Sequence, residues 1–349
     1  REVRSGLPKP IFFFAGLTGV AIVSAVLSPD SAAALRGAVM EPQTVSFMLV
    51  MLGLMLAPLF LQGSKRHVLY VGLSLGAGLF ALISYVVLRL IAGPVLGFGS
   101  FVSVTQSPGG NFNDVALIAA ALLIIAVISL IQLPLKTVSQ GVAATVGVFA
   151  LIVLAAVNSL YIWLVVGFFG LLVLLYLLTH DVLFSGEDTH VSFKPQAVVI
   201  GLAVLICITI AVFVVRGESA GSFVSNLFNV EYLEVRPSLS ATVGIAREVY
   251  ADNLLLGVGP NQFASAWREH KPMQMNQTLF WDTTFQAGGG FMPTLFVTLG
   301  LLGGLMTVAF TISYLWFGIR SLLRPSTADP FWYFVGVATF TSAAFLWLM

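Results

Sequence analysis

The chain alternates between long apolar runs and short polar connections, with one long polar interruption late in the sequence. About 20 residues of helix span the ~30 Å hydrocarbon core of a bilayer, and nine runs approach or exceed that length. Transmembrane barrels show alternating segments of ~10 residues instead. The pattern therefore predicts an all-α, polytopic membrane helix bundle. The nine helices are expected at about 10–28, 43–62, 68–91, 114–131, 138–157, 159–179, 197–215, 291–317 and 331–349.

The polar interruption covers residues 216–290. It holds 12 of the 31 formal charges, so we expect a water-exposed and mainly helical subdomain. The chain then divides into a bundle of about seven helices at 1–215, this large loop, and the last helices at 291–349. It begins at Arg1 without a methionine and stops at Met349 inside an apolar run, so we expect a fragment of a longer protein.

The Lys and Arg residues of the short connections are distributed unevenly. When nine helices alternate, nine of these residues fall on the side of the N-terminus, and only Arg36 and Arg89 fall on the other. Cytoplasmic loops carry the excess of positive charge. The N-terminus is therefore predicted to be cytoplasmic and the loop 216–290 extracytoplasmic.

Composition supports the membrane assignment and excludes several chemistries. Charged residues are 9% of the chain, against about 25% in soluble domains, and the mean hydropathy is +0.99. The single cysteine, Cys207, excludes a disulfide framework. No Asp-x-Asp motif and no ligand-type histidine spacing occurs, so we expect no metal, no cofactor and no nucleotide-sugar donor. A net charge of +1 gives no reason to expect a nucleic-acid partner.

The candidate chemistry lies in the large loop. Residues 238–251 carry apolar positions at helical spacing, with Ser238 as the start signal. Arg236 stands just before this helix, whose first N–H groups lack partners. An arginine beside a helix N-terminus is suited to bind phosphate or diphosphate. The alternative is that Arg236 pairs with Glu231 or Glu234.

Downstream, the Gly-Val-Gly-Pro stretch at 257–260 is predicted to reverse the chain into a second short helix beginning at Pro260. That helix carries His270, and histidine is the side chain that most often serves as a general base. We expect the aromatic residues of this region to anchor the loop at the bilayer interface, or one of them to stack on a sugar. They are Trp267, Phe280, Trp281 and Phe285.

Three motifs follow one another in 236–304. An arginine opens a helix, Leu-Leu-Gly-Val-Gly-Pro-Asn-Gln-Phe forms a turn at 255–263, and Gly-Leu-Leu-Gly begins at Gly300. In this order they resemble the signature region of the O-antigen ligase/polymerase superfamily of bacterial membrane proteins. The glycines at 300, 303 and 304 also have the spacing that lets another helix approach closely.

The resemblance implies metal-independent glycan transfer at the outer face of the bacterial inner membrane. The donor would be an undecaprenyl-diphosphate-linked glycan, and the acceptor a hydroxyl on a glycan, lipid or protein. Arginines, here Arg236, would neutralise the departing diphosphate, and a histidine would take the acceptor proton. Substrate-binding positions would be Gly257, Gly259, Pro260, Asn261, Gln262, Phe263, Trp267 and Lys271.

The chain departs from the family pattern at two positions. The family histidine would fall near Gly289-Gly290, and the second family arginine near Asn158-Ser159-Leu160. His270 and Arg89 are the expected substitutes, unless Arg89, at a helix end, extends to the lipid head groups. Two carboxylates are further candidate bases, Glu248 and Asp282.

Two other functions remain open. Without the family histidine, the chain could bind the lipid-linked glycan without catalysing its transfer. A transporter or channel is the third possibility, although the predicted helices contain almost none of the charged residues that usually mark ion pathways.

Overall fold

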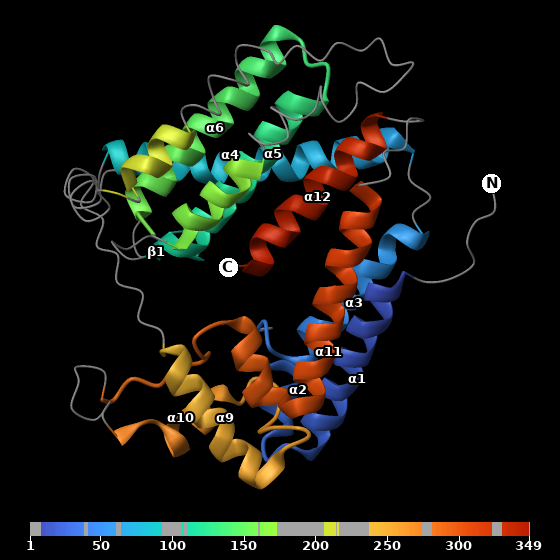
Figure 1. Ribbon diagram of the computed structural model, residues 1–349, viewed down its shortest axis with the longest axis vertical. Coiled ribbons are helices and arrows are strands. Elements are labelled where there is room, and N and C mark those ends of the chain that lie inside the picture. The colour runs from blue at the N-terminus through green and yellow to red at the C-terminus, as the bar shows by residue number, and fades with distance from the viewer. Residues whose placement is uncertain are drawn as a thin grey trace. The chain divides into compact units, whose positions relative to one another are not determined.

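The computed structural model describes residues 8–37, 41–60, 64–92, 106–107, 110–159, 161–172, 206–213, 215, 237–273, 281–322 and 330–348. Within these ranges its regular secondary structure is helical apart from one antiparallel ladder (Figure 1). That ladder joins the two-residue strands β1 (Gln106–Ser107) and β2 (Gly110–Asn111). The predicted all-α class is confirmed for the described part of the chain.

Six helices in the described ranges are long and apolar enough to cross a membrane, which indicates a multi-pass membrane protein. They are α1 (Lys9–Leu27), α4 (Lys65–Ala92), α5 (Phe112–Gln132), α6 (Thr137–Val157), α11 (Phe291–Leu322) and α12 (Pro330–Leu348). Shorter apolar helices are α3 (Val45–Phe60) and Tyr161–Leu172. Each of these eight coincides with a predicted run. Of the predicted helix at 197–215, residues 206–213 and 215 are described and helical, and the rest lies outside the described residues.

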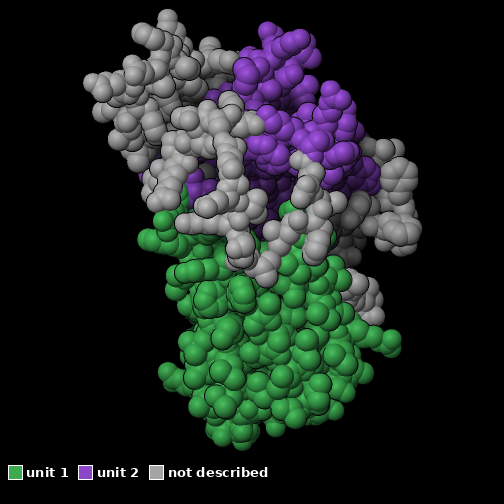
Figure 2. Space-filling view, turned by 90° about the vertical axis from the view of Figure 1, so that its right-hand side faces the viewer, with its two compact units in different colours: residues 1–63, 235–320 green, residues 64–234, 321–349 purple. Residues whose placement is uncertain are grey.

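The chain forms two compact units (Figure 2). Unit 1 contains residues 1–63 and 235–320, and unit 2 contains 64–234 and 321–349. This grouping does not follow the predicted boundaries at residues 215 and 290. Within unit 1, α11 packs both with α1 and α3 and with the C-terminal part of the polar loop.

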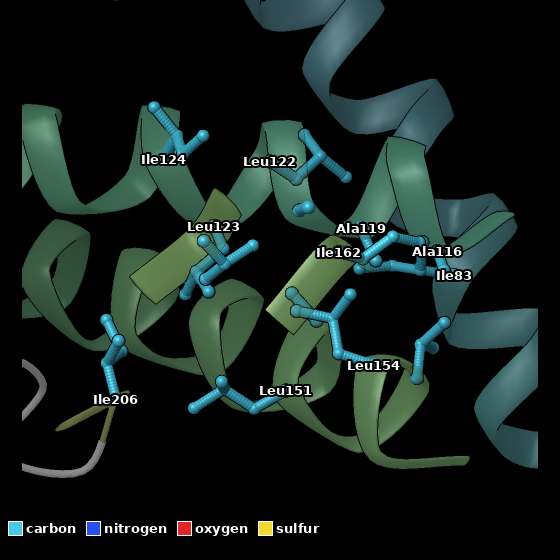
Figure 3. Packing of buried hydrophobic residues seen from close by; sticks show 14 of the residues in the cluster. Ile83, Ala116, Ala119, Leu122, Leu123, Ile124, Leu151, Leu154, Ile162 and Ile206 are labelled. Atoms are coloured by element: carbon cyan, nitrogen blue, oxygen red, sulfur yellow. The ribbon is translucent and has the colours of Figure 1, made fainter. Parts of the chain in front are cut away.

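The core of unit 2 forms around α5. Its small residues Ala116 and Ala119 are fully or almost fully buried and let neighbouring helices approach closely. Larger apolar side chains such as Leu123 and Leu154 fill the remaining space (Figure 3). At the end of α6, Asn158 adopts the left-handed conformation (φ 49°) that commonly terminates a helix.

Unit 1 has two apolar clusters that meet along α11. The first joins α1, α2 (Ser31–Arg36), α3 and α11, and includes Leu295 and Leu299. The second joins α9 (Leu239–Asn253) and α10 (Phe263–His270) to α11 through Val297. Residues of α11 thus contribute both to the packing of the apolar helices and to the core of the polar subdomain.

Candidate functional site

The helix α11 is interrupted at Gly300, which has φ 64° and ψ −162°. A residue in this conformation cannot continue an α-helix. The break removes the two hydrogen bonds that would join the N–H groups at 301–302 to the carbonyl groups at 297–298. These four backbone groups, two of them on the buried residues Val297 and Thr298, need other partners, because a buried polar group without a hydrogen bond is costly.

Residues 254–259, here called the inserted loop, supply all four partners. Two of its N–H groups donate to the freed carbonyls, and two of its carbonyls accept from the freed N–H groups. With the donor first, the pairs are Val258–Val297 (3.3 Å), Gly259–Thr298 (2.9 Å), Leu301–Leu254 (2.9 Å) and Leu302–Leu255 (3.2 Å). The loop therefore replaces the missing turn of hydrogen bonds in the broken helix.

Glycine is required on both sides of this contact. A Cβ added at Gly257 (φ 65°) would lie 2.3 Å from the Val297 carbonyl oxygen and 2.6 Å from the Gly300 nitrogen. A Cβ added at Gly300 would lie 2.5 Å from the Leu255 carbonyl carbon. The two backbones can approach this closely only because neither residue has a side chain.

The close approach predicted at the glycines 300, 303 and 304 occurs at Gly300, where the neighbour is the inserted loop and not another helix, while Gly303 and Gly304 have neighbours within α11. A Cβ at Gly303 would meet the Leu299 side chain, and one at Gly304 would meet the Phe296 ring. Both neighbours belong to α11 itself, across its own break. The glycines accommodate a bent helix that packs on itself.

The end of α1 holds the inserted loop from a second side. The Ser24 hydroxyl donates to the Leu256 carbonyl (2.8 Å), and the Ser28 hydroxyl donates to the Val258 carbonyl (3.3 Å). Gly259 (φ 109°) leaves room for this contact, since a Cβ there would lie 2.5 Å from the Ser28 Oγ. The loop is thus fixed between α1 and α11.

Two predicted substrate-binding side chains bond to the connection between α1 and α3. Asn261 (φ 59°) donates through Nδ2 to the Ala33 carbonyl (3.4 Å) and to the Glu41 carboxylate. Gln262 donates through Nε2 to the Asp30 carbonyl (3.2 Å). The contact brings the Glu41 carboxylate to the turn at 255–263. No motif surrounds Glu41, so only its contact with Asn261 identifies it.

Helix α10 begins later than predicted. Gln262 is its N-cap and Phe263 its first residue, while Pro260 is a buried residue of the preceding turn. Phe263 is 0% exposed and belongs to the core of the subdomain. Phe263 and Pro260 therefore shape the fold at this point and present no open surface to a substrate.

Trp267 is also a core residue. It is 1% exposed, its ring meets that of Phe285 edge to face at 4.8 Å, and its indole N–H donates to the Thr283 carbonyl (3.0 Å). A side chain enclosed in this way reaches neither lipid nor sugar, so interfacial anchoring by Trp267 and Phe285 is wrong. Trp281 is 60% exposed, and Phe280 lies outside the described residues.

The two basic candidates of the second helix lie at its far end. His270 is the last residue of α10, about 10 Å along the axis from the first at 1.5 Å per residue. Its Nε2 lies 3.9 Å from the Glu269 carboxylate, and Lys271 donates through Nζ to the Trp281 carbonyl (2.6 Å). The structure therefore does not bring His270 to the inserted loop.

The start of α9 agrees with the sequence prediction. Ser238 is the N-cap, and its hydroxyl accepts a hydrogen bond from the Ala241 N–H (3.1 Å). Gly289 packs on this end of α9: its N–H donates to the Thr242 hydroxyl (2.8 Å), and a Cβ there would lie 2.9 Å from the Leu239 nitrogen. The position at which the family has its histidine thus lies against the helix that Arg236 precedes.

Both arginine assignments stay predictions. Arg236 lies outside the described residues, as do its alternative partners Glu231 and Glu234. Arg89 lies in the last turn of α4 and is partly exposed. It belongs to unit 2, so the geometry of unit 1 does not bear on it.

No protein-family model matches the chain, and no curated protein matches it. What the chain does is therefore inferred from its own residues and from the contacts among them.

Proposed function

We propose that the chain is an O-antigen ligase/polymerase-like glycosyltransferase of the bacterial inner membrane. It transfers a glycan from an undecaprenyl-diphosphate carrier to a hydroxyl on an acceptor glycan, lipid or protein. The proposal includes nine transmembrane helices, a cytoplasmic N-terminus and catalysis on the extracytoplasmic side, where the loop 216–290 lies.

The observation that carries the proposal is the contact between two of the motifs on which the resemblance rests. The turn at 255–263 and the Gly-Leu-Leu-Gly at 300–303 are far apart in the sequence, yet the first fills the break in the helix that the second creates. Short glycine motifs occur by chance. Two such motifs that bond to each other in the folded chain support the family resemblance more strongly than either motif alone.

Two further features of unit 1 support the proposed location and chemistry. Asn261 and Gln262 bond to the connection between α1 and α3, so that connection and the turn lie at the same end of the unit. Helix alternation assigns both to the extracytoplasmic side. The N-terminus of α9 follows Arg236 directly, and an arginine beside a helix N-terminus suits a departing diphosphate.

The test is Arg236→Ala in purified protein reconstituted with a lipid-diphosphate-linked glycan. We expect transfer to fall by about 10²–10³-fold, as for loss of one group that stabilises transition-state charge. Arg247→Ala, an exposed arginine on α9, is the matched control and should transfer normally. Unchanged turnover in Arg236→Ala would remove this assignment. If the wild type binds the donor but does not transfer the glycan, the chain is better described as a non-catalytic binder of the lipid-linked glycan. If the same vesicles show solute flux, the transporter or channel is favoured.

A further inference from the structure

The proposed transfer needs a group that takes the proton of the acceptor hydroxyl. The position of the family histidine holds Gly289 and Gly290, neither of which has a side chain, and His270 lies at the far end of α10 from the inserted loop. Glu248 and Asp282 are exposed, and the structure shows no hydrogen bond or ion pair of either with the turn at 255–263, here called the signature turn. Glu41 is the carboxylate that does contact it.

The Glu41 carboxylate is held in a defined position. Its Oε2 accepts a hydrogen bond from Asn261 Nδ2, and Asn261 belongs to the signature turn. Gly37 (φ 62°) leaves space for both groups, because a Cβ there would lie 2.5 Å from Glu41 Oε2 and 3.1 Å from Asn261 Nδ2. Among the described residues, Asn261 is the only side-chain partner of this carboxylate, which is partly buried.

The neighbouring Gln43 connects this position to the start of α9. Its Nε2 lies 3.5 Å from the carbonyl oxygen of Gln286, a few residues before Gly289, which packs on α9. Its Oε1 is buried and has no hydrogen-bond partner in the described part of the chain. A buried acceptor without a donor is unusual in a folded protein, and a sugar hydroxyl is a suitable donor.

We infer that Glu41 is the general base of the proposed transfer, an inference that rests on the proposed function. The oxygen of the acceptor hydroxyl forms a bond to the anomeric carbon of the donor sugar. The bond between that carbon and the diphosphate oxygen breaks, and its electron pair leaves with the diphosphate. The proton of the hydroxyl passes to the Glu41 carboxylate and from there to water. Asn261 is a positioning residue that orients the carboxylate.

The first test is Glu41→Gln. Glutamine has the same size and keeps an oxygen for Asn261, so the fold and the turn should persist, while the side chain can no longer accept the proton. We expect the transfer rate to fall by about 10²–10⁴-fold, the usual contribution of a general base. Binding of undecaprenyl diphosphate to the protein in nanodiscs should be unchanged. Asp252→Asn, which removes an exposed carboxylate at the end of α9, is the control and should transfer at the wild-type rate.

A second variant separates proton transfer from a structural role. In Glu41→Ala, added formate should restore part of the transfer rate, because a small carboxylate can occupy the vacated space and accept the proton. Wild-type transfer by Glu41→Gln would overturn the inference, as would loss of undecaprenyl diphosphate binding together with transfer, or absence of rescue by formate. If the wild-type protein neither binds undecaprenyl diphosphate nor transfers glycan, the proposed function itself fails. If the wild type and Glu41→Gln both transfer glycan, only the assignment of Glu41 fails.

Discussion

Substitution of Gly257 by alanine tests whether the inserted loop holds the broken helix together. The new Cβ would lie 2.3 Å from the Val297 carbonyl oxygen and 2.6 Å from the Gly300 nitrogen, and all of these are backbone atoms that cannot rotate away. The loop must therefore withdraw from α11. Withdrawal breaks the bonds donated by the N–H groups at 258–259 and those accepted by the carbonyls at 254–255.

The cost has two parts. Alanine in the left-handed conformation costs about 1–2 kcal/mol. Each of the buried carbonyls at 297–298 is left without its donor, at about 1–3 kcal/mol per buried polar group, whereas the N–H groups at 301–302 belong to more exposed residues and add little. Together the free energy of unfolding of unit 1 should fall by about 3–8 kcal/mol, a large share of the ~5–15 kcal/mol by which proteins are typically stable. The melting temperature should fall by on the order of 10 °C or more.

The assay is thermal unfolding of the detergent-solubilised protein, followed by hydrogen exchange of the amides of Leu301 and Leu302. These amides should lose protection in Gly257→Ala because their acceptors lie in the inserted loop. Gly244→Ala is the matched control: it lies within α9, a Cβ there meets nothing within 4 Å, and alanine should stabilise the helix by up to about 1 kcal/mol. If Gly257→Ala melts like the wild type and keeps both amides protected, the loop does not support the helix.

Two more predictions concern the subdomain. Trp267→Ala should lower the stability by about 3–5 kcal/mol, since the ring is buried against Phe285, whereas Trp281→Ala at an exposed position should have little effect in the same melting experiment. Tyr250→Phe removes the hydrogen bond to the Phe296 carbonyl (3.1 Å) and should cost about 1 kcal/mol. Burial raises the pKa of Tyr250 because it disfavours the phenolate. The stabilisation by Tyr250 is therefore present below the unfolded pKa near 10 and is lost as the pH rises through the folded pKa. In an ultraviolet titration, Tyr250→Phe should remove one tyrosine that ionises late; the same number of late-ionising tyrosines in the variant and the wild type would contradict the prediction.

The apolar helices were predictable because the thickness of the bilayer imposes both their length and their composition. The predicted run at 114–131 corresponds to α5 at Phe112–Gln132, and the run at 138–157 to α6 at Thr137–Val157. The helix start at Ser238 was predictable for a local reason, since its hydroxyl caps the N–H three residues later. The apolar helices depend on the surrounding bilayer and the cap at Ser238 depends on residues next to it in the sequence, so both can be predicted without knowledge of the fold.

The break at Gly300 was not predictable by the same means. A glycine in an apolar run has the same sequence signature whether it allows another helix to approach or interrupts its own helix. The difference is set by the partner at 254–259, which is distant in the sequence. The same is true of Glu41, whose neighbours form no recognisable motif and whose contact with Asn261 appears only in the folded chain.

Trp267 shows a different limit. Aromatic residues in the outer loop of a membrane protein commonly mark the interface, but a polar subdomain also needs a core, and its largest apolar side chains supply it. Trp267 occurs at a helical position that faces α9, where it packs in one cluster with Ile245 and Phe263. Composition alone gives no means of distinguishing an aromatic residue that anchors from one that is buried.

The inserted loop also explains how a water-exposed subdomain can position groups relative to a membrane helix. In hydrocarbon, backbone groups without partners cost several kcal/mol each, so a broken helix persists only where other parts of the protein satisfy it. Here the partners belong to the segment between α9 and α10, and α1 holds the same segment through Ser24 and Ser28. Displacement of the subdomain would therefore expose the break in α11, and straightening of α11 would release the subdomain. The start of α9, which follows Arg236, and the Asn261 amide that holds Glu41 are both attached to this one junction. A change at Gly257 or Gly300 should therefore alter the proposed diphosphate binding and the proposed proton transfer together.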